Sequence, residues 1–404
     1  MTEAAQAYAQ ILASLKAEGR LRTLDHGNAA GLLDCTDNDY MGLGRDTAAT
    51  QRFLRSLIDV GGGEKERREI EMVSCYGEKG EAEALMGSLA SRLLMSRQDA
   101  YTSFECDLES EYGRPALIFN SGYHANTGCV AALAIPGTLI VADKLVHASI
   151  IDGIFLSKAP FKRFRHNDLT SLRKILDTEA GSYDRVLVIA ESIYSMDGDC
   201  APLRELAALK EQYPGMMLYI DEAHGFGVRG ERGLGLCEET GILAQVDCLI
   251  GTLGKAAASS GAFAILSPLL KEYMINAARS FIFSTALPPV SVIWSASRFR
   301  CLTGMRAERE HLRKIAARLK AGVEEVTGET CVSDSQILPV MCGSSEKAVR
   351  LSEAMRRHGV LALPIRRPTV PPGTERLRIS LNAAMTEADI DKILSALKNS
   401  WHEV

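Results

Sequence analysis

The stretch GTLGKAAASSG, residues 251–261, gives the strongest indication of how this chain folds. It follows the apolar run Cys248–Ile250 and places one lysine, Lys255, among glycines, alanines and serines. Lysines usually lie on polar surfaces, where water solvates their charge. In a cramped and uncharged turn, desolvation disfavours the charged form and makes the amine available for chemistry. Lys255 is therefore a candidate reactive group placed directly after a strand.

Short apolar runs like the one before Lys255 recur along the middle of the chain. Segments with helical periodicity, such as residues 201–213, separate several of them. Continuous apolar strands that alternate with helices are typical of a mostly parallel sheet covered on both faces. We therefore expect an α/β fold. The six expected strands are 116–120, 139–143, 185–192, 216–223, 247–252 and 261–266.

The pattern changes near STALPP, residues 284–289, and a long helical stretch over about 290–327 follows. We expect three parts: an N-terminal helix and arm (1–45), a large domain (46–289) and a small C-terminal α+β domain (290–404). Residues 46–86 are rich in charge and are expected to form helix and loop exposed to solvent.

Composition narrows the class of protein. The 404 residues carry a formal net charge of -5, which does not favour nucleic acid or an anionic membrane as a partner. None of the ten cysteines forms a C-x-x-C pair, so we do not expect a metal site. We expect the cysteines to be reduced thiols in a cytoplasmic protein. The N-terminus lacks the pattern of a signal peptide, and the most apolar region, 130–141, is too short to span a bilayer.

Polar residues follow the expected strands in order. Each alone has an ordinary structural explanation, such as a turn, a helix cap or a buried structural histidine. Together they fit an active site, because the carboxyl ends of parallel strands meet at one edge of a sheet. They are Ser121, Gly122, His147, Ser195, Asp221, His224 and Lys255.

Three of these features suggest one cofactor. A lysine can form a Schiff base, an aspartate can keep a pyridinium nitrogen protonated, and the helix start after Gly122 can hold a phosphate. These are the groups that bind pyridoxal 5′-phosphate (PLP). The letters DEAH at 221–224 also occur in nucleotide-hydrolysing motors, but the phosphate loop that such a motor needs is missing around Lys255.

Longer motifs make the interpretation specific. NSGYHANTG (120–128), ADKLVHASIIDG (142–153), ESIYSMDGDCAPL (191–203), YIDEAHGFG (219–227), GTLGKA (251–256) and FIFSTALPP (281–289) together resemble the α-oxoamine synthases, PLP enzymes of fold type I. The resemblance covers most of the chain. It implies a mostly parallel seven-stranded sheet, PLP as cofactor, and a homodimer with the active site at the subunit interface.

The resemblance also implies roles for individual residues. Lys255 would carry the cofactor and act as base, Asp221 would hold the pyridine nitrogen, and His147 would stack on the ring. The other expected cofactor contacts are His224, Ser195, Gly122, Tyr123, Thr252, Ser284 and Thr285, with Ser284 and Thr285 reaching the other subunit's phosphate. The expected substrate contacts are Arg378, Asn38, Arg366 and Thr369.

Within the family, IRRPTVPPGTERLRISLNAA (365–384) most resembles the members that join L-alanine to a pimeloyl thioester, carried by CoA or a carrier protein, in biotin synthesis. Members that use glycine or serine are the alternatives, followed by a fold type I aminotransferase or lyase and by a non-catalytic homologue. The chain departs from common family residues at Leu89, Met95, Ser96, Tyr101 and Met385.

Overall fold

The computed structural model describes residues 3–18, 20–22, 29–58 and 85–404. The chain forms two compact units. The larger unit comprises residues 39–195 and 200–309, and the smaller unit comprises 1–38, 196–199 and 310–404. The division into domains 1–45, 46–289 and 290–404 stays a prediction. The two units are defined by contacts between residues, and such contacts do not test which parts of the chain fold independently.

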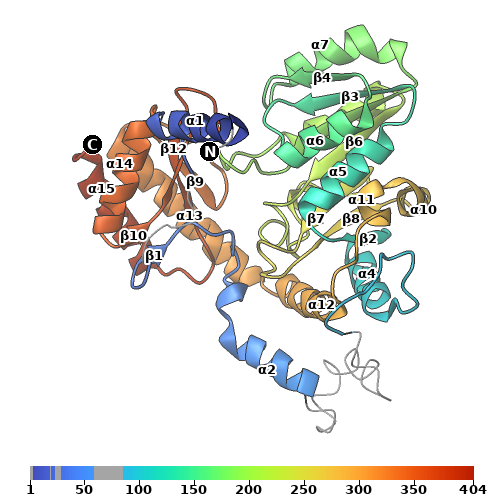
Figure 1. Ribbon diagram of the computed structural model, residues 1–404, viewed down its shortest axis with the longest axis horizontal. Helices are drawn as coiled ribbons and strands as arrows, with labels where there is room; N and C mark the ends of the chain where they lie inside the picture. The colour runs from blue at the N-terminus through green and yellow to red at the C-terminus, as the bar shows by residue number, and fades with distance from the viewer. Residues whose placement is uncertain (1–2, 19, 23–28, 59–84) are drawn as a thin grey trace. The chain divides into compact units, whose positions relative to one another are not determined.

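The larger unit is built on one seven-stranded sheet (Figure 1). Its order is β2-β8-β7-β6-β5-β3-β4, and all strands run parallel except β8. The fold class expected from the sequence is confirmed. The strands are β2 Ala116–Phe119, β3 Thr138–Asp143, β4 Phe161–Phe164, β5 Arg185–Glu191, β6 Met216–Asp221, β7 Cys248–Thr252 and β8 Ala262–Leu266.

Six of these strands coincide with the expected apolar runs, and β4 does not. Its residues read Phe-Lys-Arg-Phe, and the first three are exposed. As the edge strand beside β3, β4 has a neighbour on one side only. A polar, charged edge strand protects a sheet against pairing with other chains, and it also removes the apolar signal by which a strand is recognised.

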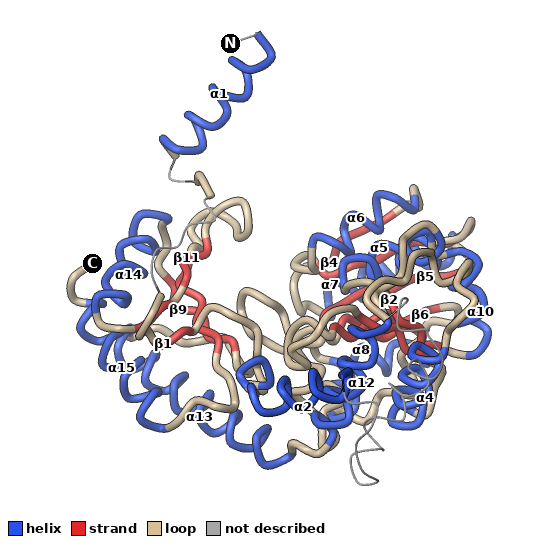
Figure 2. Tube along the Cα trace, turned by 60° about the horizontal axis from the view of Figure 1, so that its bottom comes forward, coloured by secondary structure: helices blue, strands red, loops and turns tan. Residues whose placement is uncertain are grey.

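Helices cover the sheet, so its strands are buried on both faces (Figure 2). One core cluster joins alternate residues of the strands, such as Ile140 and Ala142 of β3, to apolar residues of α5, α6, α10 and α11. The intervening residues, such as Leu139 and Val141, are fully buried too, so the opposite face is also covered. The helices of this unit are α2 Thr47–Ile58, α4 Asp99–Tyr112, α5 Gly122–Leu133, α6 Ala148–Ser157, α7 Leu169–Glu179, α8 Leu203–Gln212, α9 Leu236–Glu239, α10 Pro268–Ala277, α11 Arg279–Ile282 and α12 Pro289–Thr303, with 3-10 turns η1 Leu43–Arg45 and η3 Ala180–Ser182.

The long helical stretch expected at 290–327 is two helices. α12 ends at Thr303, and α13 (Arg306–Thr327) starts after Gly304 and Met305. Gly304 is a poor helix residue, because it lacks a side chain to restrict its backbone. α13 runs from the larger unit into the smaller one.

The smaller unit is α+β, as the sequence predicts for the C-terminal part. An antiparallel sheet has the order β11-β12-β9, and β1 pairs with β10 in a separate parallel ladder. The strands are β1 Leu33–Asp34, β9 Ile337–Met341, β10 Val360–Leu361, β11 Leu363–Ile365 and β12 Arg376–Ser380, and the helices are α1 Glu3–Ala17, α14 Ser345–Arg357 and α15 Glu387–Trp401.

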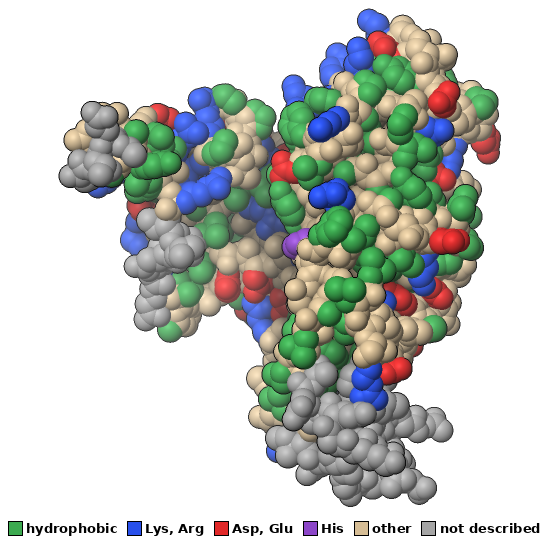
Figure 3. Space-filling view, turned by 45° about the vertical axis from the view of Figure 1, so that its right-hand side comes forward, with side chains coloured by type: hydrophobic (Ala, Val, Ile, Leu, Met, Phe, Trp, Pro, Cys, Tyr) green, Lys and Arg blue, Asp and Glu red, His purple; other side chains and the backbone are tan. Residues whose placement is uncertain are grey.

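The chain's surface charge is mixed. Basic and acidic side chains are interspersed over the face shown in Figure 3, in keeping with 46 basic and 51 acidic residues in the whole chain. Within the described ranges, no helix is both long enough and apolar enough to cross a membrane.

Candidate active site

The turn that carries Lys255 is fixed by backbone hydrogen bonds. Leu253 N–H donates to Gly261 O at 2.9 Å, and Ala258 N–H donates to Lys255 O at 2.9 Å. Small residues are needed here. Ala258 lies in the left-handed region, with φ of 47°, and a Cβ on Gly251 would come within 2.2 Å of the Phe263 ring. The sequence of the turn therefore positions a half-buried lysine at the end of β7.

The Lys255 amine lies against a histidine. Lys255 Nζ is 2.8 Å from His224 Nε2, and His224 Nδ1 is 2.7 Å from the hydroxyl of buried Tyr40. Two charged nitrogens cannot share one hydrogen bond, so one member of the Lys255–His224 pair acts as acceptor. Tyr40 orients the imidazole, and the imidazole in turn orients the amine.

Asp221 occupies the carboxyl end of β6, the strand next to β7. The carboxylate is 4% exposed and accepts two hydrogen bonds, from Asn126 Nδ2 at 2.7 Å and from Ala223 N–H at 2.8 Å. A buried carboxylate is costly unless donors compensate for lost water. Asn126, in the second turn of α5, is one such donor.

Asn126 links Asp221 to His147. Its amide nitrogen also lies 3.0 Å from Ser149 Oγ, and its oxygen accepts from the Tyr219 hydroxyl at 2.6 Å. Ser149 Oγ lies 2.7 Å from His147 Nδ1, which also accepts from Ser149 N–H at 3.2 Å. The network therefore specifies the tautomer of His147 in which Nδ1 lacks a proton.

Burial shifts the pKa values of His147 and Glu191, and in both it favours the uncharged form. Desolvation lowers the pKa of His147, although part of the residue remains exposed; the Lys255 charge lowers it further and Asp221 opposes the shift. Burial is also the main reason that the pKa of Glu191, at the end of β5, is raised well above its usual value, and the Asp221 charge adds to this shift.

The turn between β2 and α5 lies beside the end of β7. A Cβ built on Gly122 would stand 3.6 Å from Thr252 Oγ1, so the two backbones approach closely. Ser121 caps α5 by accepting from His124 N–H at 3.2 Å. Tyr123 is exposed on the first turn and donates its hydroxyl hydrogen to Asp152. This helix start leaves backbone N–H groups directed outward, which suits an anion.

The remaining expected cofactor residues are Ser284, Thr285 and Ser195. Asn120 Nδ2 donates to Ser284 Oγ at 2.9 Å and to Thr285 O at 2.6 Å, so this segment contacts the β2–α5 turn within the same chain. Ser195 follows β5 in a turn and is half-buried. The structure thus brings the expected cofactor residues of the larger unit to the ends of adjacent strands.

The expected substrate residues belong to the smaller unit. Arg378, on β12, is buried and donates to Ser380 Oγ at 2.6 Å and to Asn38 Oδ1 at 3.1 Å. Thr369 is exposed and accepts from Arg22 at 2.9 Å. Arg366 is half-buried after β11. Arg378 and Asn38 therefore form a pair, and Thr369 lies on a separate stretch beside Arg22.

Sequence reasoning missed the supporting residues Asn126, Ser149, Tyr219 and Tyr40. Three of them lie within motifs that were singled out for other residues, NSGYHANTG, ADKLVHASIIDG and YIDEAHGFG. Asn126 carried a usable signal, because a polar side chain in the middle of the apolar helix α5, 2% exposed, needs buried partners.

Comparison with known proteins identifies relatives over most of the chain. The family model for aminotransferase class I and II matches residues 78–397. The 8-amino-7-oxononanoate synthase of Chlorobaculum parvum is 42% identical over 396 residues, covering 95% of this chain and 96% of the relative.

Solved structures share the fold. A serine palmitoyltransferase structure with PLP as an internal aldimine aligns with a TM-score of 0.83 and 28% identity, covering 98% of this chain and 97% of that one. The 8-amino-7-oxononanoate synthase of Francisella tularensis aligns with a TM-score of 0.73 and 26% identity, covering 92% of this chain and 97% of that one.

Proposed function

The chain belongs to the class I and II aminotransferase family, and from this premise we propose that it is a PLP-dependent acyltransferase that makes 8-amino-7-oxononanoate. L-Alanine would condense with pimeloyl-CoA or a pimeloyl carrier protein, releasing CO2 and the free thiol in a step of biotin synthesis. The observation that carries the proposal is the constellation of Lys255, His224 and the doubly hydrogen-bonded Asp221 at the ends of two neighbouring strands.

The residues present fit PLP. A lysine amine held by hydrogen bonding, a buried carboxylate and an open helix start supply the three attachments that this cofactor requires. We assign Lys255 to the covalent link, Asp221 to the pyridine nitrogen and His147 to the ring face. His224, Ser195, Gly122, Tyr123, Thr252, Ser284 and Thr285 are the remaining proposed cofactor contacts. PLP, when bound, supplies the electron sink for the carbanion chemistry.

The side chains of the protein supply proton transfer and orientation. Lys255, once its amine is released by the incoming amino acid, would remove the Cα proton and return a proton at the end of the cycle. His224 holds that amine in place at 2.8 Å, which makes proton transfer directional. The Asp221 carboxylate, anchored by Asn126 and Ala223, would keep a ring nitrogen protonated through a charge-assisted hydrogen bond.

Substrate recognition is assigned to the smaller unit. We propose that Arg378 binds the amino-acid carboxylate, because a buried guanidinium whose other donors are taken by Ser380 and Asn38 is fixed in direction. Arg366 and Thr369 are proposed to contact the substrate as well, with Asn38 lining the site.

The quaternary state and location are also proposals. Ser284 and Thr285 are expected to reach the phosphate site of a second subunit, which makes the enzyme a homodimer with shared active sites. We further propose a cytoplasmic enzyme, since a chain with ten cysteines and no C-x-x-C pair suits a reducing compartment.

The choice of product rests on sequence identity more than on shape. Serine palmitoyltransferase superposes better, with a TM-score of 0.83 against 0.73, and the two solved structures are 28% and 26% identical to this chain; the 42% identity to a relative named 8-amino-7-oxononanoate synthase therefore supports the choice. Substrate preference depends on individual side chains at the site, and the fold is common to many activities.

A product assay tests the proposal. The purified protein is incubated with PLP and with one pair of substrates: L-alanine and pimeloyl-CoA, glycine and acetyl-CoA, or L-serine and palmitoyl-CoA. Mass spectrometry should detect 8-amino-7-oxononanoate from the first pair. Borohydride reduction should attach the cofactor to the peptide that contains Lys255, and the Lys255→Ala variant should lose both signals. Product from another pair would be consistent with the family but would refute the proposed role in biotin synthesis. Absence of cofactor attachment to Lys255 would refute the proposed mechanism.

A further inference from the structure

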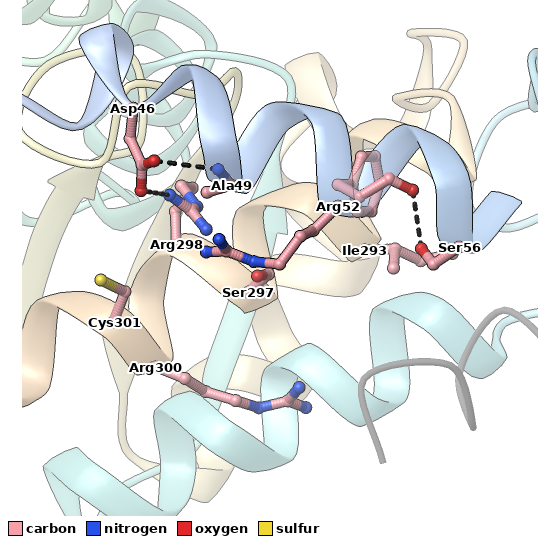
Figure 4. A pocket seen from close by; sticks show the side chains of 10 residues that line it. Asp46, Ala49, Arg52, Ser56, Ile293, Ser297, Arg298, Arg300 and Cys301 are labelled. Atoms are coloured by element: carbon pink, nitrogen blue, oxygen red, sulfur yellow. Dashed lines mark hydrogen bonds and ion pairs between the residues drawn. The ribbon is translucent and has the colours of Figure 1, made fainter. Parts of the chain in front are cut away.

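A cavity of about 320 Å³ lies within the larger unit, between helices α2 and α12 (Figure 4). None of the residues assigned above to the reaction lines it. The volume is at the lower end of the range for small-molecule sites. The cavity is lined by Asp46, Ala49, Arg52, Phe53, Ser56, Ile293, Ser297, Arg298, Arg300 and Cys301.

Arg298 is the most informative lining residue. It is 6% exposed, and neither Nε nor Nη1 has a hydrogen-bond acceptor among the described residues. Its Nη1 lies 3.6 Å from Asp46 Oδ2, which is an ion-pair distance but too long for a hydrogen bond. Its guanidinium also lies over the Trp294 ring, 4.3 Å from the centroid. A buried guanidinium with unused donors indicates that an acceptor belongs beside it.

A second guanidinium faces the first. Figure 4 shows the side chains of Arg52, from α2, and Arg298, from α12, directed toward each other across the cavity. Within the part of the chain that the structure describes, Arg52 makes no ion pair. Arg300 points toward α4, where it pairs with Asp107 at 2.8 Å. The space between the helices therefore holds two guanidinium groups that have Asp46 as their nearby carboxylate.

Asp46 is only a partial counterion, because its other oxygen is occupied. Asp46 Oδ1 accepts from Ala49 N–H at 2.9 Å and so caps the first turn of α2. Asp46 pairs with Arg298 and caps the helix, so the exposed Arg52 guanidinium adds positive charge to the cavity lining that no ion pair within the described residues compensates. Water screens the exposed Arg52 charge in the free protein, and an anion placed between the two guanidinium groups would compensate for their repulsion directly.

We propose that this cavity binds a phosphate group, held between Arg52 and Arg298. The planar fork of a guanidinium matches phosphate oxygens in pairs, and Arg298 has two unused donors for such an anion. The hydroxyl group of Ser297 in the lining is a further donor, whereas the Ser56 hydroxyl already donates to Phe53 O at 2.6 Å. Two sources share this chemistry: free inorganic phosphate and a phosphate of CoA.

Helix α12 connects the cavity to the Lys255 turn through Trp294. Trp294, on which Arg298 stacks, donates its indole N–H to Ala258 O at 3.3 Å, and Ala258 N–H bonds to Lys255 O. Trp294 also packs on Phe53 of α2, with ring centroids 4.9 Å apart. Trp294 thus touches both walls of the cavity and serves as a built-in fluorescent reporter.

The test uses the full chain saturated with PLP, so that phosphate cannot enter the cofactor site. Inorganic phosphate is titrated by calorimetry at constant ionic strength, with sodium chloride as the reference salt. We expect saturable binding with one site per chain. Arg52→Ala should weaken it about tenfold or more, since it removes one of two charge-assisted partners, while Arg55→Ala, on the same helix but outside the cavity lining, should leave it unchanged.

A second variant keeps the test independent of losses in folding. Asp46→Asn retains a good helix cap and removes the competing carboxylate, so it should tighten phosphate binding. In a Trp401→Phe background, phosphate should change the fluorescence of Trp294, which locates the site. Titration with CoA then identifies the source of the phosphate. If Arg52→Ala weakens the binding of inorganic phosphate but not of CoA, the ligand is free phosphate. If Arg52→Ala weakens the binding of both, the ligand is the CoA phosphate.

Two results would overturn the proposal: the absence of saturable phosphate binding, or binding that Arg52→Ala and Asp46→Asn leave unchanged. Either result can be told apart from failure of the proposed function, because binding of inorganic phosphate to the PLP-saturated chain requires no turnover. Conversely, phosphate binding would stand even if the product assay failed.

Discussion

Asn126 is the residue on which the candidate active site most depends without taking part in the chemistry. It makes three buried hydrogen bonds: to Asp221 at 2.7 Å, to Ser149 at 3.0 Å and from Tyr219 at 2.6 Å. Replacing Asn126 with alanine would leave the Asp221 carboxylate, which is 4% exposed, and the Tyr219 hydroxyl, which is fully buried, each without this partner.

The expected cost follows from these three bonds. A hydrogen bond to a charged group is worth about 1.5–3 kcal/mol, and a buried hydroxyl left without a partner costs about 1–3 kcal/mol. Water that enters the space left by the amide would recover part of this loss. We therefore expect Asn126→Ala to lower the free energy of unfolding of the larger unit by about 3 kcal/mol.

The measurement is urea unfolding of the cofactor-free protein, followed by far-ultraviolet circular dichroism and by fluorescence to test whether the transition is two-state. Asn276→Ala is the matched control, because Asn276 donates to Glu272 O at 2.8 Å on an exposed helix surface. The control should stay within about 0.5 kcal/mol of the wild type. If Asn126→Ala were equally harmless, the network would not support Asp221, and its role in orienting the carboxylate would be refuted.

Two further predictions concern the strand ends. Gly251→Ala should destabilise the protein by about 2–3 kcal/mol in the same urea experiment, because the new Cβ would meet the Phe263 ring at 2.2 Å. Gly181→Ala is the control and should have little effect, because a Cβ at Gly181 meets nothing within 4 Å. Burial raises the pKa of Glu222 above its usual 4.5, so the folded state keeps this proton at a pH where the unfolded chain has lost it. The resulting stability is fully present below about pH 4.5 and is lost as the pH rises, so the wild type should lose stability relative to Glu222→Gln between pH 4.5 and 8. A constant difference between the two proteins would contradict the raised pKa of Glu222.

The sequence predicts the central sheet well, and the reasons are physical. A strand buried on both faces must be apolar along its whole length, so β3 and β5 are visible as continuous runs. The edge strand β4 is exposed on three of its four residues and has no such signature. The division between α12 and α13 depends on two residues, Gly304 and Met305, which a helical pattern does not resolve.

The candidate site shows the same limit at the level of side chains. Lys255, Asp221 and His147 could be grouped from the sequence, because parallel strands bring their carboxyl ends to one edge. The partners of these residues could not be predicted, since they depend on the rotation of α5 over the sheet. That rotation, set by the packing of residues such as Ala125 and Cys129 in the core, directs Asn126 toward Asp221.

Burial distributes charge unevenly among the acids at the strand ends. Glu191 and Asp221 are paired residues on β5 and β6, and Glu222 follows directly. Burial raises the pKa of both glutamates, and the charge of Asp221 adds to the shift of Glu191. Asp221 alone among the three has an amide side chain and a backbone N–H directed at its two oxygens.

Burial therefore disfavours the charged form of both Glu191 and His147, two residues close to Asp221. A low-polarity site with one fixed carboxylate binds a protonated ring nitrogen strongly, because few other charges compete for it and little reorganisation is needed. If Glu191 were ionised as well, the charge would be shared and its direction lost. The asymmetry among these acids therefore supports the proposed chemistry, because burial disfavours the charged form of the two glutamates while Asn126 and Ala223 direct their donors at Asp221.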